Sequence, residues 1–278
     1  MSNVVKCQHH VSKSYLREWS TRDRLFCLQD GRIRLANIKD VAVERHFNQL
    51  HALEPDDISY LQKMWIDPFP HSRQVNNNYM MMFTLSANLR RELTAEFEAK
   101  HPEFVKELDQ QIINTEEEYH SRLETDFSPL IESARQGKID FYEDADRCIP
   151  FLLSLCVQYF RTNGMKRKMI DLHKATLGID LSRVWNVLSH ILATNVAYSL
   201  FRDRKRMPLA LLENNTELPF ITSDQPVINL LGTGSDTQAP THLALYYPIH
   251  QTERCLSMIP KNHVTLERFK YLSMTSRG

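Results

Sequence analysis

Glycine is scarce in this sequence, with 7 residues among 278. Sandwiches and barrels with many tight turns need glycine at positions of positive φ, so the scarcity argues against both. It also argues against a glycine-rich phosphate-binding loop. No Walker loop, G-x-G-x-x-G, G-x-S-x-G or H-E-x-x-H occurs. The sequence therefore gives no support to the enzyme classes that these motifs mark.

An excess of either charge is also missing, because Lys+Arg and Asp+Glu both number 34. A nucleic-acid-binding domain usually carries a basic excess, so any such contact must use a local patch. Basic clusters at 166–168 and 202–206 are candidates, although basic residues also suit helix ends. A near-neutral surface favours self-association or a protein partner.

Long apolar runs and closely paired cysteines are absent as well. No stretch reaches the roughly 18 apolar residues of a membrane span, and residues 1–13 lack the apolar run of a signal peptide. The five cysteines are odd in number and form no C-x-x-C. This usage is typical of free thiols in a reducing compartment. We expect a cytoplasmic protein without a membrane contact.

Helical periodicity dominates the middle of the chain. Residues 144–160 and 181–201 carry wide apolar faces and are predicted to be the two central helices. Leucine and phenylalanine at four-residue spacing predict a helix over 85–97. A further helical stripe begins near Pro102, and Ser128-Pro129 predicts a break and restart in it.

Strand patterns lie towards the two ends. Asp30-Gly31 between alternating runs at 24–29 and 32–38 predicts a β-hairpin. Short strands are predicted at 207–213, 220–222, 243–247 and 256–259, and a loop at 232–240. Without a βαβ rhythm, we expect a mostly α, α+β fold. Its small antiparallel or mixed sheet would combine the N-terminal hairpin with the C-terminal strands.

The whole chain is predicted to be one domain, 1–278. It would consist of a hairpin segment (1–50), a helical core (51–206) and C-terminal strands that complete the sheet (207–278). This arrangement would bring the N-terminal segment close to the C-terminal strands.

The first candidate site feature is the pair His9-His10. Adjacent histidines in a non-helical segment can point to opposite sides, so one could ligate a metal or act as an acid or base. The alternative is a histidine that only anchors the start of the chain. The second feature is the turn Thr222-Ser223-Asp224-Gln225-Pro226. Asp224 and Ser223 could serve a site at a strand end, or only cap backbone amides.

Two further segments could contribute. Arg161 ends an apolar helix and is a candidate clamp for a carboxylate or phosphate, with Gln158 on the same face. A salt bridge from Arg161 to an acid such as Asp224 is the alternative. Glu44 follows a short apolar run and could add a second carboxylate, or form a surface ion pair.

Four segments resemble a widespread bacterial family of unknown function. Residues 9–17 are similar to its His-His-x-Pro-x-x-Tyr-Leu start, and 220–227 to its Phe-x-Thr-Ser-Asp-Asn-Pro-Val segment. Residues 158–162 resemble its Gln-x-x-Arg-Thr helix end, and 247–249 its Phe-Pro-Leu. The order and approximate spacing agree along nearly the whole chain.

The chain departs from that pattern at three positions. Ser12 stands where proline is usual, Trp19 where phenylalanine is usual and Gln225 where asparagine is usual. The resemblance implies that one constellation joins the matching residues, which are His9, His10, Tyr15, Arg161, Ser223 and Asp224.

The leading functional hypothesis is a bacterial antiphage-defence or toxin-type effector that acts on a nucleic acid or nucleotide, as a nuclease-like hydrolase. His9 or His10 would be a base or metal ligand, Asp224 a ligand or base, and Arg161 an anion clamp. Tyr15, Gln158, Ser223 and Glu44 would contact the substrate. The sequence leaves the cofactor open; a divalent metal is the candidate, with His10 and Asp224 as its candidate ligands. The alternative is a non-enzymatic sensor or scaffold that binds a protein partner or a second copy.

Overall fold

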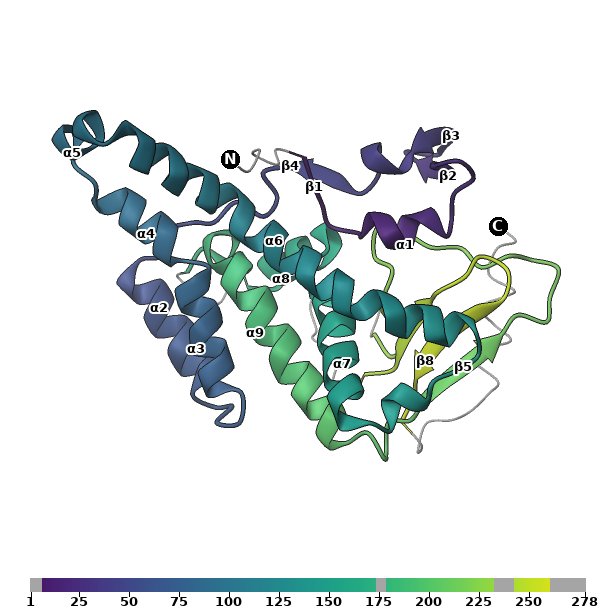
Figure 1. The fold of residues 1–278 in the computed structure, drawn as a ribbon. Coiled ribbons are helices and arrows are strands. Elements are labelled where there is room, and N and C mark those ends of the chain that lie inside the picture. The colour runs from purple at the N-terminus through teal and green to yellow at the C-terminus, as the bar shows by residue number, and fades with distance from the viewer. Residues whose placement is uncertain (1–6, 174–178, 233–242, 261–278) are drawn as a thin grey trace.

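A computed structural model describes residues 7–173, 179–232 and 243–260. Two helices form its centre, α7 (Ala145–Phe160) and α9 (Leu181–Arg202). Each begins at an aspartate whose side chain accepts a backbone N–H of the first turn, Asp144 and Asp180 respectively. The two helices lie side by side in Figure 1, and their facing apolar side chains are buried. Both central helices were predicted, and both are confirmed.

The long helix α6 (Pro102–Arg135) runs across this pair, with proline at its first position. It continues through Pro129, so the predicted break at Ser128-Pro129 is wrong. A proline interrupts one helical hydrogen bond, but burial of Ile131 and Ala134 beyond it keeps the segment on the core. The predicted helix 85–97 is two helices, because Thr94 caps a new start.

The remaining helices surround this core. An arm at one end of the molecule holds α2 (Pro55–Leu61), the π-helical turn Gln62–Ile66, α3 (Arg73–Met82), α4 (Leu85–Glu92) and α5 (Ala95–Lys100). Near the centre lie α1 (Lys13–Arg17), α8 (Asn163–His173) and the 3-10 turns Ile38–Asp40 and Asp140–Tyr142. No helix in the described parts of the chain is long and apolar enough to cross a membrane.

The described strands pair in three antiparallel sheets. In the first, β1 (Cys7–His9) pairs with β4 (Val43–Arg45). In the second, β2 (Arg24–Gln29) pairs with β3 (Arg32–Asn37) around Asp30-Gly31, where both residues have positive φ. The third has the order β5-β8-β7-β6. Its strands are β5 (Leu209–Glu213), β6 (Ile228–Asn229), β7 (Leu245–Pro248) and β8 (Arg254–Met258).

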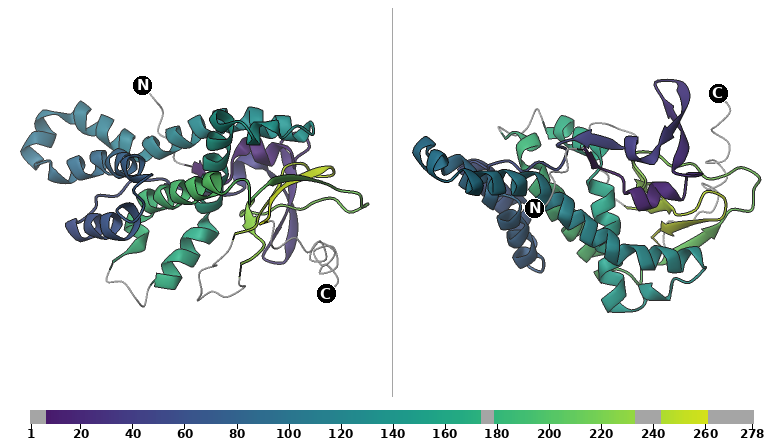
Figure 2. Two further views of the ribbon diagram at one scale, coloured as in Figure 1. Left: turned by 90° about the horizontal axis from the view of Figure 1, so that it is seen from below. Right: turned by 45° about the horizontal axis from the view of Figure 1, so that its top comes forward.

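The mostly α, α+β class and the hairpin are confirmed, but the hairpin does not join the C-terminal strands. It projects from the body in the right-hand view of Figure 2. Its apolar residues Phe26 and Ile33 face solvent and are 77% and 74% exposed. The alternating pattern therefore predicted the strands correctly without indicating which strand each would pair with.

Two predictions for the C-terminal third, a strand at 220–222 and a loop at 232–240, are not confirmed. Residues 220–222 form no strand, although the backbone N–H of Phe220 donates to the oxygen of Gln251 at 2.7 Å. Pro219 and Pro226 flank this stretch and remove ladder donors. The loop predicted at 232–240 lies, beyond Gly232, outside the described residues.

All five cysteines are free, and burial raises the pKa of Cys148 to about 11 and of Cys255 to about 12.

Candidate functional site

Arg161, at the end of α7, fixes the N-terminal segment. Its Nε donates to the backbone oxygen of His10 and its Nη2 to that of His9, each at 3.1 Å. Its Nη1 pairs with Oε1 of Glu124 at 3.0 Å. Only 6% of the Arg161 side chain is exposed. The predicted ion pair therefore exists with Glu124 of α6 instead of Asp224, and three donor atoms of the guanidinium already have protein acceptors.

Gln158 and Ser12 reinforce this anchor. Gln158 donates Nε2 to the same His10 oxygen at 3.2 Å, and Ser12 donates its hydroxyl to Oε2 of Glu124 at 2.7 Å. Residues 9–12 are thus bonded to both α6 and α7. Each carboxylate oxygen of Glu124 has a partner.

The side chains of the two histidines lie apart from that network. His9 Nε2 is 3.4 Å from the oxygen of Ile38, and the His10 ring packs 5.5 Å from the ring of Phe47. Burial lowers the pKa of His10 to about 4, and the charge of Asp224 is the strongest influence that opposes this shift. The exposed carboxylate of Asp224 therefore acts on the His10 ring electrostatically.

The Thr222–Pro226 turn is held by α1 and by the end of α7. Thr222 and Tyr15 share a hydrogen bond of 2.7 Å between their hydroxyl oxygens. Gln225 donates Nε2 to the oxygen of Tyr159 at 3.0 Å, and its Oε1 accepts from Thr162. Ser223 accepts the backbone N–H of Gln225, which is a turn role.

Glu44 lies outside this network. Its carboxylate accepts Nδ2 of Asn163 at 2.7 Å on the exposed side of β4. Its segment does meet the others, since β4 pairs with β1 and sets Glu44 opposite Gln8, but the Glu44 side chain is exposed and bonds to Asn163 of α8.

A cavity of about 300 Å³ opens between α1, α6, α7 and β7. Three predicted site residues line it, Tyr15, Gln158 and Arg161. The rings of Tyr15 and Tyr247 stack in its wall with centroids 5.1 Å apart. The side chains of His9, His10, Ser223, Asp224 and Glu44 do not line this cavity.

The charges around the cavity are paired with each other. Arg161 pairs with Glu124, and Arg135 lies 3.4 Å from Glu18. One polar group in the wall has no partner, since the buried hydroxyl of Ser154 makes no hydrogen bond. A buried hydroxyl without a partner is unfavourable, so a ligand that bonds to it would be stabilised there.

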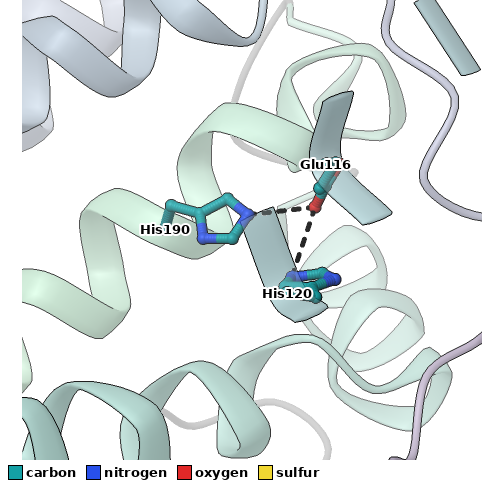
Figure 3. Close-up of side chains that lie close together, drawn as sticks. All are labelled: Glu116, His120 and His190. Carbon is teal, nitrogen blue, oxygen red and sulfur yellow. Dashed lines mark hydrogen bonds and ion pairs between the residues drawn. The ribbon is translucent and has the colours of Figure 1, made fainter. Parts of the chain in front are cut away.

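A second polar cluster, which the sequence patterns above did not indicate, lies deeper in the helical core (Figure 3). Glu116 and His120 come from α6 and His190 from α9, and they are 4%, 2% and 1% exposed. Glu116 Oε1 is 3.0 Å from His190 Nε2 and 3.9 Å from His120 Nε2. Each of the three offers one potential metal-ligand atom, and these atoms lie within 4.8 Å of one another. The described parts of the chain hold no other group of three or more such residues.

The surroundings of this cluster are largely apolar. The ring of Phe83 stacks on His190 at 4.6 Å, and Tyr119 meets His190 edge-on at 5.0 Å. Burial, together with the charges of Arg161 and His190, holds the pKa of His120 well below its usual range. His120 is therefore neutral at physiological pH.

A local signal for the cluster is present in the sequence. Glu116, His120 and Glu124 are four residues apart, so one face of α6 carries all three. We call these three residues the polar seam. The seam continues an apolar stripe through Leu108 and Ile112, and both of those residues are buried.

The comparisons with known proteins agree with this whole-chain picture. Residues 7–265 match the family described as "Protein of unknown function (DUF4238)". The chain belongs to the DUF4238 family. No curated protein and no solved structure matches this DUF4238 protein. Its chemistry must therefore be inferred from its own side chains.

Proposed function

We propose that this DUF4238 protein binds a small, ring-containing polar ligand of nucleoside or nucleoside-monophosphate size in the cavity between α1, α6 and α7. The main support is that Tyr15, Gln158 and Arg161, which come from distant parts of the chain, line one cavity that also holds the unpartnered hydroxyl of Ser154. Small-molecule sites commonly combine an apolar wall with a few convergent polar groups.

The size of the cavity restricts the ligand. A volume of about 300 Å³ is at the lower end of small-molecule sites, so a nucleoside-sized group fits and a polymer does not. Tyr15, Phe127 and Tyr247 provide an aromatic wall against which a planar ring can pack.

The charges restrict it further. Three arginines and three glutamates line the cavity, so its net charge is zero. A neutral ligand, or one with a single anionic group, is therefore favoured over a triphosphate. Arg17 is more than half exposed at the rim, and its ion pair with the equally exposed Asp23 lies at the surface, where a phosphate can compete for it.

A binding measurement tests this proposal. The four ribonucleosides and their 5′-monophosphates are titrated into the protein by calorimetry, with saturation-transfer NMR for weak binders. Ser154→Ala removes the unpartnered hydroxyl, and we expect it to weaken binding roughly tenfold, corresponding to about 1.4 kcal/mol. Ser86→Ala, at another buried helical serine, is the matched control and should bind as the wild type does. If none of the eight probes binds, the proposal fails.

Phosphoester hydrolysis near His10 and Asp224 is a second candidate function, which would suit a defence or toxin role. It is supported by the electrostatic influence of Asp224 on His10 and by a His10 that is neutral at pH 7 and so able to accept a proton. Single-stranded DNA and RNA should then be cleaved in the presence of Mg²⁺ or Mn²⁺. Replacement of either His10 or Asp224 by alanine should abolish cleavage, and full cleavage by both variants would exclude this chemistry.

A further inference from the structure

We propose that Glu116, His120 and His190 bind one divalent transition-metal ion of the zinc class, which ties α6 to α9 in the helical core. The site is separate from the ligand cavity and does not depend on the function proposed for it.

The donor set fits such an ion. Imidazole nitrogens and a carboxylate oxygen are common ligands of Zn²⁺, and a site with one carboxylate and two imidazoles leaves the bound ion with a positive charge. Two of the donors are one helical turn apart on α6, and the third comes from α9 (Figure 3). An ion there would bridge α6 and α9. Among the described residues, no lysine or arginine of either helix pairs with an acid of the other.

The distances fit as well. Ligand atoms about 2.1 Å from a tetrahedral ion lie about 3.4 Å from each other. The two measured separations from Glu116 Oε1, 3.0 Å to His190 Nε2 and 3.9 Å to His120 Nε2, lie on either side of that value. The ligand atoms of the two histidines also lie within 4.8 Å of each other.

Unpartnered polar atoms provide an independent reason. Both ring nitrogens of His120 and Nδ1 of His190 are buried and make no hydrogen bond. Buried polar atoms nearly always have a partner, because burial without one is unfavourable. A metal ion would satisfy His120 Nε2, the nitrogen that faces Glu116 in Figure 3.

The charge of Glu116 points in the same direction. Among the described residues, its carboxylate has only the two histidines within ion-pair distance. The ammonium group of Lys166 acts on it from farther away. A buried carboxylate needs close compensation, which a divalent cation supplies.

Asn186 positions the carboxylate. It lies one turn before His190 on α9, and its Nδ2 donates to Oε2 of Glu116, which leaves Oε1 turned to the histidines. The side-chain oxygen of Asn186, Oδ1, is also buried without a hydrogen-bond partner. Because Phe83, Tyr79 and Tyr119 pack around His190, the ion would stabilise the core and would not meet a substrate.

Metal analysis of protein purified without a histidine tag tests the proposal. We expect about one equivalent of zinc or a similar ion per chain. After chelation, addition of Co²⁺ should produce visible d–d absorption typical of a low-coordinate site. Glu116→Gln is nearly isosteric and should weaken Zn²⁺ binding, measured against a chromophoric chelator, at least tenfold.

Glu117→Gln is the matched control, because Glu117 is the next residue on α6, is half-buried and accepts a hydrogen bond from Asn48 instead of contacting the histidines. It should bind Zn²⁺ as the wild type does. Circular dichroism checks the fold of both variants, and His190→Asn replaces Glu116→Gln if the latter does not fold. Wild-type protein that neither retains a metal nor binds Zn²⁺ or Co²⁺ would overturn the proposal. Equal binding by the Glu116→Gln and Glu117→Gln proteins would also overturn it, because the ion would then be bound elsewhere.

Discussion

The two ends of the polar seam on α6 differ in how completely their polar groups are bonded. At Glu124, one carboxylate oxygen accepts from Arg161 and the other from Ser12. At Glu116, the carboxylate meets imidazoles of which three nitrogens have no partner. A fully bonded buried network fixes a structure, whereas a partly bonded one marks a place where something else can bind. The contrast assigns a bracing role to the Glu124 end and a binding role to the Glu116 end.

Loss of the bracing end should have the largest effect. Arg161→Met leaves the backbone oxygen of His9 without its donor, leaves that of His10 with Gln158 alone, and removes the cation beside the half-buried Glu124. A lost buried hydrogen bond of this kind typically costs about 1–3 kcal/mol, and the three losses together amount to roughly 3–5 kcal/mol. We expect a fall of that size in the free energy of unfolding, measured by urea denaturation. Arg17→Met, at an exposed arginine, should change it by less than about 0.5 kcal/mol. A loss below about 1 kcal/mol for Arg161→Met would show that the network does not brace the fold.

At the Glu116 end of the polar seam, added metal should raise the free energy of unfolding. Zn²⁺ at about 100 times its Kd should raise the free energy of unfolding by about 2.7 kcal/mol, because the ion binds the folded chain only. For a chain of this length, that corresponds to a rise of roughly 5–10 °C in Tm. The rise should be absent in Glu116→Gln and intact in Glu117→Gln. A rise of equal size in both variants would contradict the assignment of this end.

The buried His10, whose backbone oxygen is bonded to Arg161, should make the free energy of unfolding depend on pH. Its pKa is about 4 when folded and about 6.5 when unfolded, so the unfolded chain binds the proton more tightly. Stability should be constant above pH 6.5 and fall as the pH drops from 6.5 to about 4. The expected loss is on the order of 2 kcal/mol. Asp224 opposes the pKa shift, while Arg161, His9 and Arg167 add to it.

Replacement of His10 by phenylalanine isolates this contribution. Phenylalanine keeps a ring beside Phe47 and cannot take up a proton, so the slope of stability between pH 6.5 and 4 should decrease. His101→Gln, at an exposed histidine, should leave the slope unchanged. An unaltered slope in the His10→Phe protein would mean that other groups cause the pH dependence.

The smallest effect on stability is expected at the β2–β3 hairpin. Its apolar side chains are exposed, in contrast to the buried polar side chains of α6. Phe26→Ser and Ile33→Thr should each change the free energy of unfolding by less than about 0.5 kcal/mol, because both side chains face solvent. Under the sensor or scaffold hypothesis, the same changes should weaken association measured by sedimentation velocity. A large loss of stability would instead mean that the hairpin packs on the body of the protein.

Local patterns predicted much of this fold. The helices α7 and α9 were predictable because their apolar faces extend over many turns, and the β2–β3 hairpin because Asp30-Gly31 specifies its turn. Pairing between distant strands was not predictable, since alternation defines the faces of a strand without naming its neighbour. The hairpin was therefore assigned to the wrong sheet.

The candidate site shows the same division. The sequence predicted that the His9-His10 segment meets the Thr222–Pro226 turn because of a shared sheet and because of the family motifs. The shared sheet is wrong, but both segments bond to the end of α7. Glu116 and His120 formed a visible i, i+4 pair, but His190 lies on an apolar helix face, where a histidine usually indicates core. Only the packing of α6 on α9 brings the three together.

Pro129 gives the cavity wall a property of its own. Because proline has no N–H, the backbone oxygen of Thr125 loses its helical partner, while Phe127 and Ser128 in the same turn line the cavity. Local opening requires less free energy where a hydrogen bond is already missing. Amide hydrogens around this turn should therefore exchange with solvent faster than those in the first half of α6. The cavity wall would then include a turn that opens more readily than the rest of α6.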